Sequence, residues 1–186
     1  MSQLDKNIEK LFKSLGSPEK DHIDSLIKGI NNKDPDSIKE LMEVLGTKPK
    51  RPLYYVATHL RYLPEFGSRD VMRYCGDYID QLVRFILEDR RYLSKWFLKP
   101  LGGNLKLFRK YIEPELYEQL MLFNKIYTSA KHDFNHEEDK CRFNYIDTIY
   151  YIFITKHLAE ILLPMSERAQ DYNNHGNTFY SYNPKD

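Results

Sequence analysis

The sequence predicts an all-α protein, an antiparallel helical bundle with a small N-terminal helical lobe. Apolar residues recur every three or four positions along most of the 186-residue chain, which is the spacing of a buried helix face. No stretch alternates apolar and polar residues as a half-buried strand would, and no β-hairpin dipeptide joins two such stretches. The 41% hydrophobic content is enough for a packed core, so we do not expect a disordered chain.

Residues 1–48 are expected to form the N-terminal lobe from three short helices. Gly16 ends the first helix. Ser17-Pro18 and Asp34-Pro35 each supply a cap followed by a proline at the first helical position. The apolar faces of the three helices are Leu4, Ile8, Leu11, Phe12 and Leu15, then Ile23, Leu26, Ile27 and Ile30, then Ile38, Leu41, Met42 and Leu45. The basic segment 47–52, with its two prolines, predicts the boundary that follows.

Residues 53–164 are expected to form the helical bundle. A first helix runs over 53–63, and Ser68 caps a long helix whose apolar spacing holds to residue 87. Gly102-Gly103 break the chain, and Asn104 caps a short helix to residue 112. Pro114 opens the next helix, and the last one covers about 138–163. We expect residues 165–186 to be a loose C-terminal tail.

Composition excludes several classes of protein. The net charge of +1 excludes a uniformly basic nucleic-acid binder. No apolar run approaches the roughly 20 residues of a membrane span, and the polar start MSQLDKNIEK is not a signal peptide. Two cysteines without metal-type spacing indicate a reduced, cytoplasmic protein. Gly102-Gly103 lack the lysine and the preceding strand of a phosphate loop, so we predict no nucleotide cofactor, and indeed no cofactor at all.

Charge is concentrated in one segment of the chain. Residues 84–112 carry eight positive and two negative side chains, a net +6, whereas residues 113–186 carry seven positive and twelve negative, a net −5. Cations beside aromatic rings are typical of single-stranded nucleic-acid binding. The alternative is that the basic and acidic segments pair within the fold and the aromatic rings belong to the core. The candidate nucleic-acid-binding residues are Arg84, Arg90, Arg91, Lys95, Trp96, Lys99, Lys106, Arg109 and Lys110.

A metal site is one hypothesis for the histidines. His132 and His136 are four residues apart, so on a helix they would share a face, and Asp133 or Asp139 could add a third ligand. The zinc-protease order, with Glu directly after the first His, is absent. A polar surface turn explains the same residues, and we predict no metal site.

The stretch NKIYTSAKHDF, residues 124–134, ends one amphipathic helix, and a long helix closing with KHLAEILLP follows it. Over about residues 104–164 this arrangement resembles the HEPN superfamily, all-α proteins common in prokaryotic toxin–antitoxin and phage-defence systems. Its catalytic members carry Arg, then four to six residues, then His, often with Tyr two positions beyond. They are metal-independent ribonucleases and usually act as dimers.

The resemblance implies that His132 acts as general acid/base on RNA, with Lys125, Asn124 and Lys131 beside it. Six residues separate Lys125 from His132, so Lys125 would take the place of the Arg. Two departures reduce the match: a lysine lacks the planar bidentate grip of arginine on phosphate, and Phe134 lacks the hydroxyl of the Tyr. The implied function is RNA binding or cleavage, with a catalytic motif that can be degenerate.

The competing hypothesis is a helical protein–protein interaction or regulatory module without catalysis, bound to a protein partner or to a second copy of itself. Its support is the 15 tyrosines, because Tyr gives contact area at low entropic cost. Five of them cluster within 25 residues: Tyr54, Tyr55, Tyr62, Tyr74 and Tyr78.

Overall fold

The computed structural model describes residues 3–44, 68–90, 99–132 and 145–175, and within them the protein is all-α, as predicted. No strand occurs in these ranges. Two short 3₁₀ helices, η3 (Arg109–Tyr111) and η5 (Leu163–Met165), accompany the α-helices. The α-helices are α1 (Gln3–Ser14), α2 (Lys20–Asn31), α3 (Pro35–Val44), α5 (Ser68–Asp89), α6 (Leu101–Phe108), α7 (Pro114–His132), α8 (Tyr145–Leu162) and α9 (Glu167–His175).

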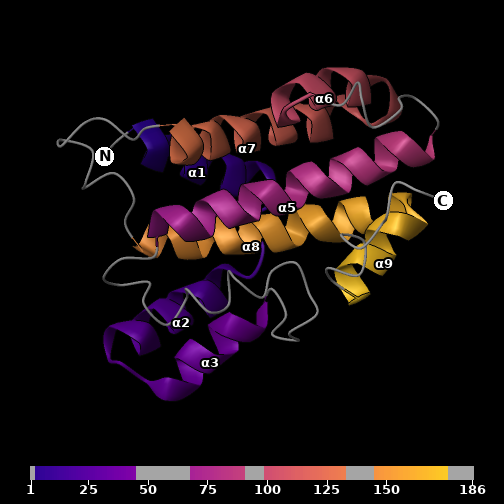
Figure 1. Cartoon of the computed structure of the whole chain (residues 1–186). Helices are drawn as coiled ribbons and strands as arrows, with labels where there is room; N and C mark the ends of the chain where they lie inside the picture. The colour runs from indigo at the N-terminus through magenta and orange to yellow at the C-terminus, as the bar shows by residue number, and fades with distance from the viewer. Residues whose placement is uncertain (1–2, 45–67, 91–98, 133–144, 176–186) are drawn as a thin grey trace.

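Helices α5 and α8 pack side by side through the middle of the protein (Figure 1). Helices α6, α7 and α9 pack on α5, while α1, α2 and α3 pack on α8. This position explains why apolar residues cover most of α8 instead of one stripe, because a helix packed from several directions exposes only a few side chains, such as Glu160. Its buried side chains include Ile149, Tyr151, Ile152, Ile154, Leu158 and Leu162. None of the described helices is long and apolar enough to cross a membrane.

The long helices α5, α7 and α8 alternate in direction along the chain. Helix α7 is antiparallel to α5, because Arg69 near the start of α5 donates to the carbonyl of Ala130 near the end of α7, over 2.8 Å. Helices α5 and α8 run the same way, and their C-terminal ends lie close. There the hydroxyl of Ser166, just beyond α8, donates to Asp89 over 2.5 Å.

The turns between the first three helices follow their sequence signals in part. Gly16 adopts a left-handed φ of 80°, and the amide of Ser17 donates to the carbonyl of Phe12 over 3.0 Å, which completes a Schellman motif. Asp34 caps α3 by accepting from the amide of Ser37 over 3.0 Å, as predicted. The start expected at Ser17-Pro18 is shifted, since Ser17 itself is left-handed and α2 begins only at Lys20.

The chain does not break at Gly102-Gly103, contrary to our prediction. Helix α6 begins at Leu101, and both glycines lie in its first turn. Side chains take the space that a Cβ would fill: one on Gly102 would come within 2.9 Å of Asn124, and one on Gly103 within 2.7 Å of Lys99. Asn104 bonds backward, accepting from the amide of Lys99 over 2.8 Å and donating to its carbonyl over 2.5 Å.

The tail expected to be loose from residue 165 contains a helix over part of its length. Helix α9 packs on α5, with Ala169 and Tyr172 buried. Ser166 caps it by accepting from the amide of Ala169 over 3.0 Å. The ring of Tyr172 meets that of Phe85 edge-on, with centroids 5.2 Å apart. Apolar spacing does not predict this helix, because its polar sequence carries few apolar residues and its burial depends on α5.

The first three helices share one hydrophobic core with the bundle. Helix α1 packs on α7 and α8, and Leu11 and Ile23 are fully buried in the same cluster as the core of α5 and α8. The boundary predicted at 47–52 and the helix predicted at 53–63 lie outside the described residues. The division of the chain into domains therefore stays a prediction.

We predict that Gly76→Ala destabilises the protein. An alanine in place of glycine inside a helix normally adds about 0.5–1 kcal/mol of stability. At Gly76, however, the new Cβ would lie 2.0 Å from the ring of Tyr127. We expect the free energy of unfolding to fall by about 1–3 kcal/mol in urea denaturation. The exposed Ser25→Ala on α2 is the control; a stabilised Gly76→Ala would contradict the packing described.

We predict that Tyr150 makes stability depend on alkaline pH. Burial and a hydrogen bond to Asp24 raise the pKa of Tyr150 from 10.0 to about 12. The folded state therefore holds this proton more tightly than the unfolded state. Its contribution is complete below pH 10 and is lost as the pH rises toward 12. Urea denaturation across this range should show a steeper loss for the wild type than for Tyr150→Phe, whereas parallel profiles would refute the assignment.

Candidate functional site

A polar cluster lies where α7 crosses α5. The hydroxyl of Tyr127 donates to Asp77 Oδ1 and accepts from Lys131 Nζ, 3.1 Å away. Burial, together with the bond to Asp77, raises the pKa of Tyr127. The hydroxyl therefore remains protonated at neutral pH and joins an anion to a cation across the two helices.

A second pair extends this cluster along α5. Arg84 Nη2 lies 3.2 Å from Asp80 Oδ2 and also donates to the carbonyl of Lys99 over 3.0 Å. Burial raises the pKa of the Asp80 carboxyl, and the Arg84 guanidinium opposes that rise. A half-buried carboxyl with a raised pKa can exchange protons nearer to neutral pH than an exposed one.

The four residues predicted as catalytic occupy two faces of α7. Consecutive helical residues are about 100° apart, so Asn124 and Lys131, seven positions apart, share one face, and Lys125 and His132 share the adjacent one. Asn124 lies against Gly102, and Lys131 bonds to Tyr127. Lys125 is exposed. His132 is the last residue of α7, and its side chain lies outside the described part of the structure.

The predicted nucleic-acid-binding residues divide into groups. Arg84 is paired with Asp80, four residues earlier on α5. Asp80 lies outside the acidic segment 113–186, so pairing between the basic and acidic segments stays a prediction. Lys99 and Lys106 are exposed. The other described cations lie over tyrosine rings, with Arg90 5.2 Å and Lys110 5.1 Å from the ring centre of Tyr111, and Arg109 5.3 Å from that of Tyr117. Arg91, Lys95 and Trp96 lie outside the described residues.

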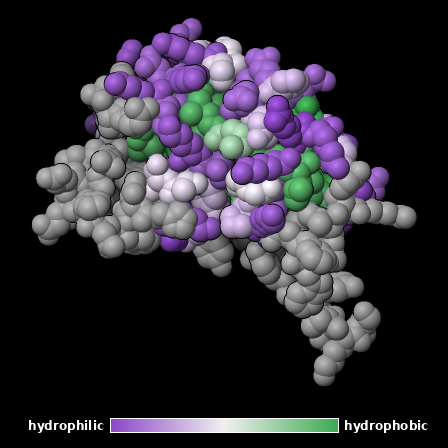
Figure 2. All heavy atoms as spheres, turned by 90° about the horizontal axis from the view of Figure 1, so that it is seen from above, coloured by the Kyte–Doolittle hydropathy of each residue, from purple (hydrophilic) through white to green (hydrophobic). Residues whose placement is uncertain are grey.

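We use the name basic surface for Arg90, Lys99, Lys106, Arg109 and Lys110, all of which are exposed. Residues 99–112 contain no Asp or Glu. In the described parts of the chain, Arg90, Lys106 and Arg109 form no ion pair with a carboxylate. The described part of the face on the side of α6 and α7 is mostly hydrophilic, with small hydrophobic areas between the hydrophilic residues (Figure 2).

A pocket between α1 and α7 was not predicted. Its volume is about 320 Å³, and Met121 and Leu122 contribute its apolar part. Its charged residues are Lys10, Glu115, Glu118 and Lys125. Of these, only Lys125 was among the predicted site residues. Nothing local in the sequence could have revealed the pocket, because it exists only where α1 meets α7.

The described residues contain no metal site. Among the described residues, no group of three or more His, Cys, Asp or Glu could hold a metal ion, while His136, Asp133 and Asp139 lie beyond them.

The clustered tyrosines differ in their surroundings. Tyr78 is buried and donates to Asn173 over 2.6 Å, so it belongs to the packing of α9. Tyr74 is half-buried under Arg73. Tyr54, Tyr55 and Tyr62 are not described, and their role at an interface stays a prediction.

Comparisons with known proteins do not add to these observations: no family model, no curated protein and no solved structure matches the chain.

We predict that Tyr127→Phe weakens the junction of α5 and α7. The substitution keeps the ring on Gly76 but removes the hydroxyl between Asp77 and Lys131. The free energy of unfolding should fall by about 1 kcal/mol in urea. Tyr117→Phe on the same helix is the matched control, because the Tyr117 hydroxyl has no hydrogen-bond partner among the described residues. Equal losses in both variants would contradict a structural role for the Tyr127 hydroxyl.

Proposed function

We propose that the protein is a HEPN-like helical protein that binds RNA through the basic surface. The observation that carries the proposal is a run of chain, residues 99–112, with exposed cations and no carboxylate. Exposed cations can neutralise phosphates and release condensed counterions. In line with the HEPN resemblance, such a protein would act in a prokaryotic defence or toxin–antitoxin system.

The tyrosines under the basic surface support this proposal. Arg90 and Lys110 share the ring of Tyr111, and Arg109 lies over Tyr117. A ring face attracts a cation without using its hydrogen-bond donors, so the guanidinium groups of Arg90 and Arg109 can still donate to a phosphate. The same cations are held in less mobile positions, which lowers the entropic cost of binding.

RNA cleavage is the further step that the resemblance implies for His132. Of the three candidate partners on α7, Lys125 is the one on the same face as His132, while Lys131 is bonded to Tyr127 on the adjacent face. Lys125 would therefore contact the phosphate, and α7 would offer no second cation on the same face as His132. Incubation of cellular RNA with the wild type and with His132→Ala distinguishes the roles, since cleavage that survives the substitution would remove His132 from the reaction.

We predict that the triple variant Lys106→Gln/Arg109→Gln/Lys110→Gln binds single-stranded RNA at least about tenfold more weakly. The slope of log affinity against log salt should also become shallower by about 2, since about 0.7 counterions are released per neutralised phosphate. Fluorescence anisotropy with a labelled single-stranded RNA, titrated at several salt concentrations, measures both quantities.

The control for this experiment removes the same number of charges elsewhere. Lys6, Lys28 and Lys39 are exposed on α1, α2 and α3. Their triple change to Gln should leave both the affinity and the salt slope close to wild type. If the two triple variants lose affinity equally, binding follows net charge and the basic surface is not the site.

A further inference from the structure

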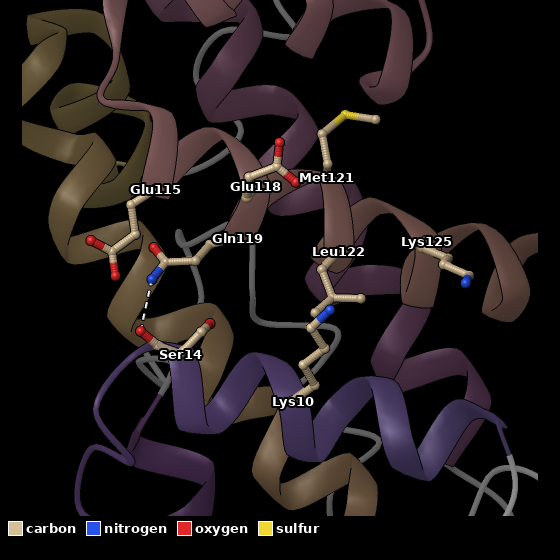
Figure 3. Close-up of a pocket in the computed structure, with 8 residues that line it drawn as sticks. All are labelled: Lys10, Ser14, Glu115, Glu118, Gln119, Met121, Leu122 and Lys125. Atoms are coloured by element: carbon tan, nitrogen blue, oxygen red, sulfur yellow. Dashed lines mark hydrogen bonds between the residues drawn. The ribbon is translucent and has the colours of Figure 1, made fainter.

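The pocket between α1 and α7 combines an apolar floor with opposite charges at its two ends (Figure 3). Glu115 and Glu118 lie on one side and Lys125 on the other, with Met121 and Leu122 between them. Lys10 reaches the floor from α1, close to Leu122. We call this site the α1–α7 pocket; its volume of about 320 Å³ lies at the small end of the range for ligand sites.

The charged side chains of the α1–α7 pocket are not paired with one another or with other described residues. None of Lys10, Glu115, Glu118 and Lys125 forms an ion pair with another described residue. Elsewhere the described helices do pair their charges at short range, as Lys13 does with Glu9 at 2.6 Å. The pocket thus presents two carboxylates and two ammonium groups to an incoming molecule.

The walls of the pocket are held in place before anything binds. Gln119 is buried, and its Nε2 donates to the carbonyl of Ser14 over 2.9 Å, which ties the C-terminal end of α1 to the first half of α7. A site whose walls are already fixed loses less entropy when it is occupied.

The spacing of the charges defines the molecule that fits. Along a helix rising 1.5 Å per residue, Lys125 lies about 10 Å from Glu118 and about 15 Å from Glu115. In an extended peptide, alternate side chains point the same way, and positions i and i+4 are about 13 Å apart. A basic side chain at i and an acidic one at i+4 therefore reach both ends, with the side chain at i+2 over Met121 and Leu122.

We propose that the α1–α7 pocket binds an extended peptide segment of a protein partner in which a basic, an apolar and an acidic residue occupy alternate positions. The basic side chain meets Glu115 and Glu118, the apolar one lies on Met121 and Leu122, and the acidic one meets Lys125. The proposal does not rest on RNA binding by the basic surface.

A peptide fits this surface better than a second folded copy does. A stable interface between folded proteins buries about 1,200–2,000 Å², with an apolar centre. Among the described residues, Ile146 on α8 is the only large hydrophobic residue that is exposed. The pocket therefore offers anchoring for a few side chains and not a broad apolar face.

The experiment uses the full chain labelled with ¹⁵N and a pentapeptide Lys-Gly-Leu-Gly-Glu with both termini blocked. NMR titration should show saturable shifts of amides in α1 and α7, with a dissociation constant on the order of 1 mM for so small a ligand. The peptides Lys-Gly-Leu-Gly-Lys and Glu-Gly-Leu-Gly-Glu should bind at least about fivefold more weakly, because each lacks one of the two charge contacts.

Protein variants locate the site. Lys125→Glu and Glu118→Lys should each weaken binding of Lys-Gly-Leu-Gly-Glu by about fivefold or more. Lys39→Glu on α3 repeats the charge change of Lys125→Glu at an exposed position outside the pocket and should have no effect on binding. Absence of shifts in α1 and α7, or equal binding of all three peptides, would overturn the proposal. A native mass of two chains that falls to one in Lys125→Glu would overturn it in favour of a second copy.

Discussion

The packing of α8 is the constraint on which the rest of the structure depends. Because α8 is apolar over most of its surface, it is covered by α5 on one side and by α1, α2 and α3 on others. The stacked rings of Phe123 and Tyr151, 4.7 Å apart at their centroids, also bring α7 against it. The N-terminal helices are for this reason part of the same core as the bundle, whatever boundary lies in the chain between them.

This packing also decides which cationic side chains are held in contacts within the fold and which remain exposed. Arg84 and Lys131 are drawn into contacts with Asp80 and Tyr127 where α5 meets its neighbours, whereas Arg90, Lys106 and Arg109 remain on the outside. The pairing of Arg84 with Asp80 leaves at most seven of the eight cations of residues 84–112 to meet a phosphate backbone. The tyrosines divide in the same way, since Tyr78 and Tyr151 are core residues and Tyr111 and Tyr117 support exposed cations.

Two surfaces of α7 and its neighbours carry the proposals, and their chemistry differs. The basic surface has cations alone and suits a polyanion. The α1–α7 pocket has both signs of charge with an apolar floor between them, which suits a short ligand of mixed charge. Lys125 belongs to the pocket, although the HEPN resemblance implies that it is a partner of His132.

Local signals in the sequence determined the helices. The spacing of apolar residues predicted α5 and α7, and Gly16, Asp34 and Pro114 predicted helix ends correctly, because caps and periodicity act within a few residues. Only the tertiary structure decided that α9 would form on α5 and that Gly102 and Gly103 would lie inside α6. It alone also created the α1–α7 pocket. These features depend on contacts such as Ser14 with Gln119, between residues far apart in the chain, and local patterns carry no information about them.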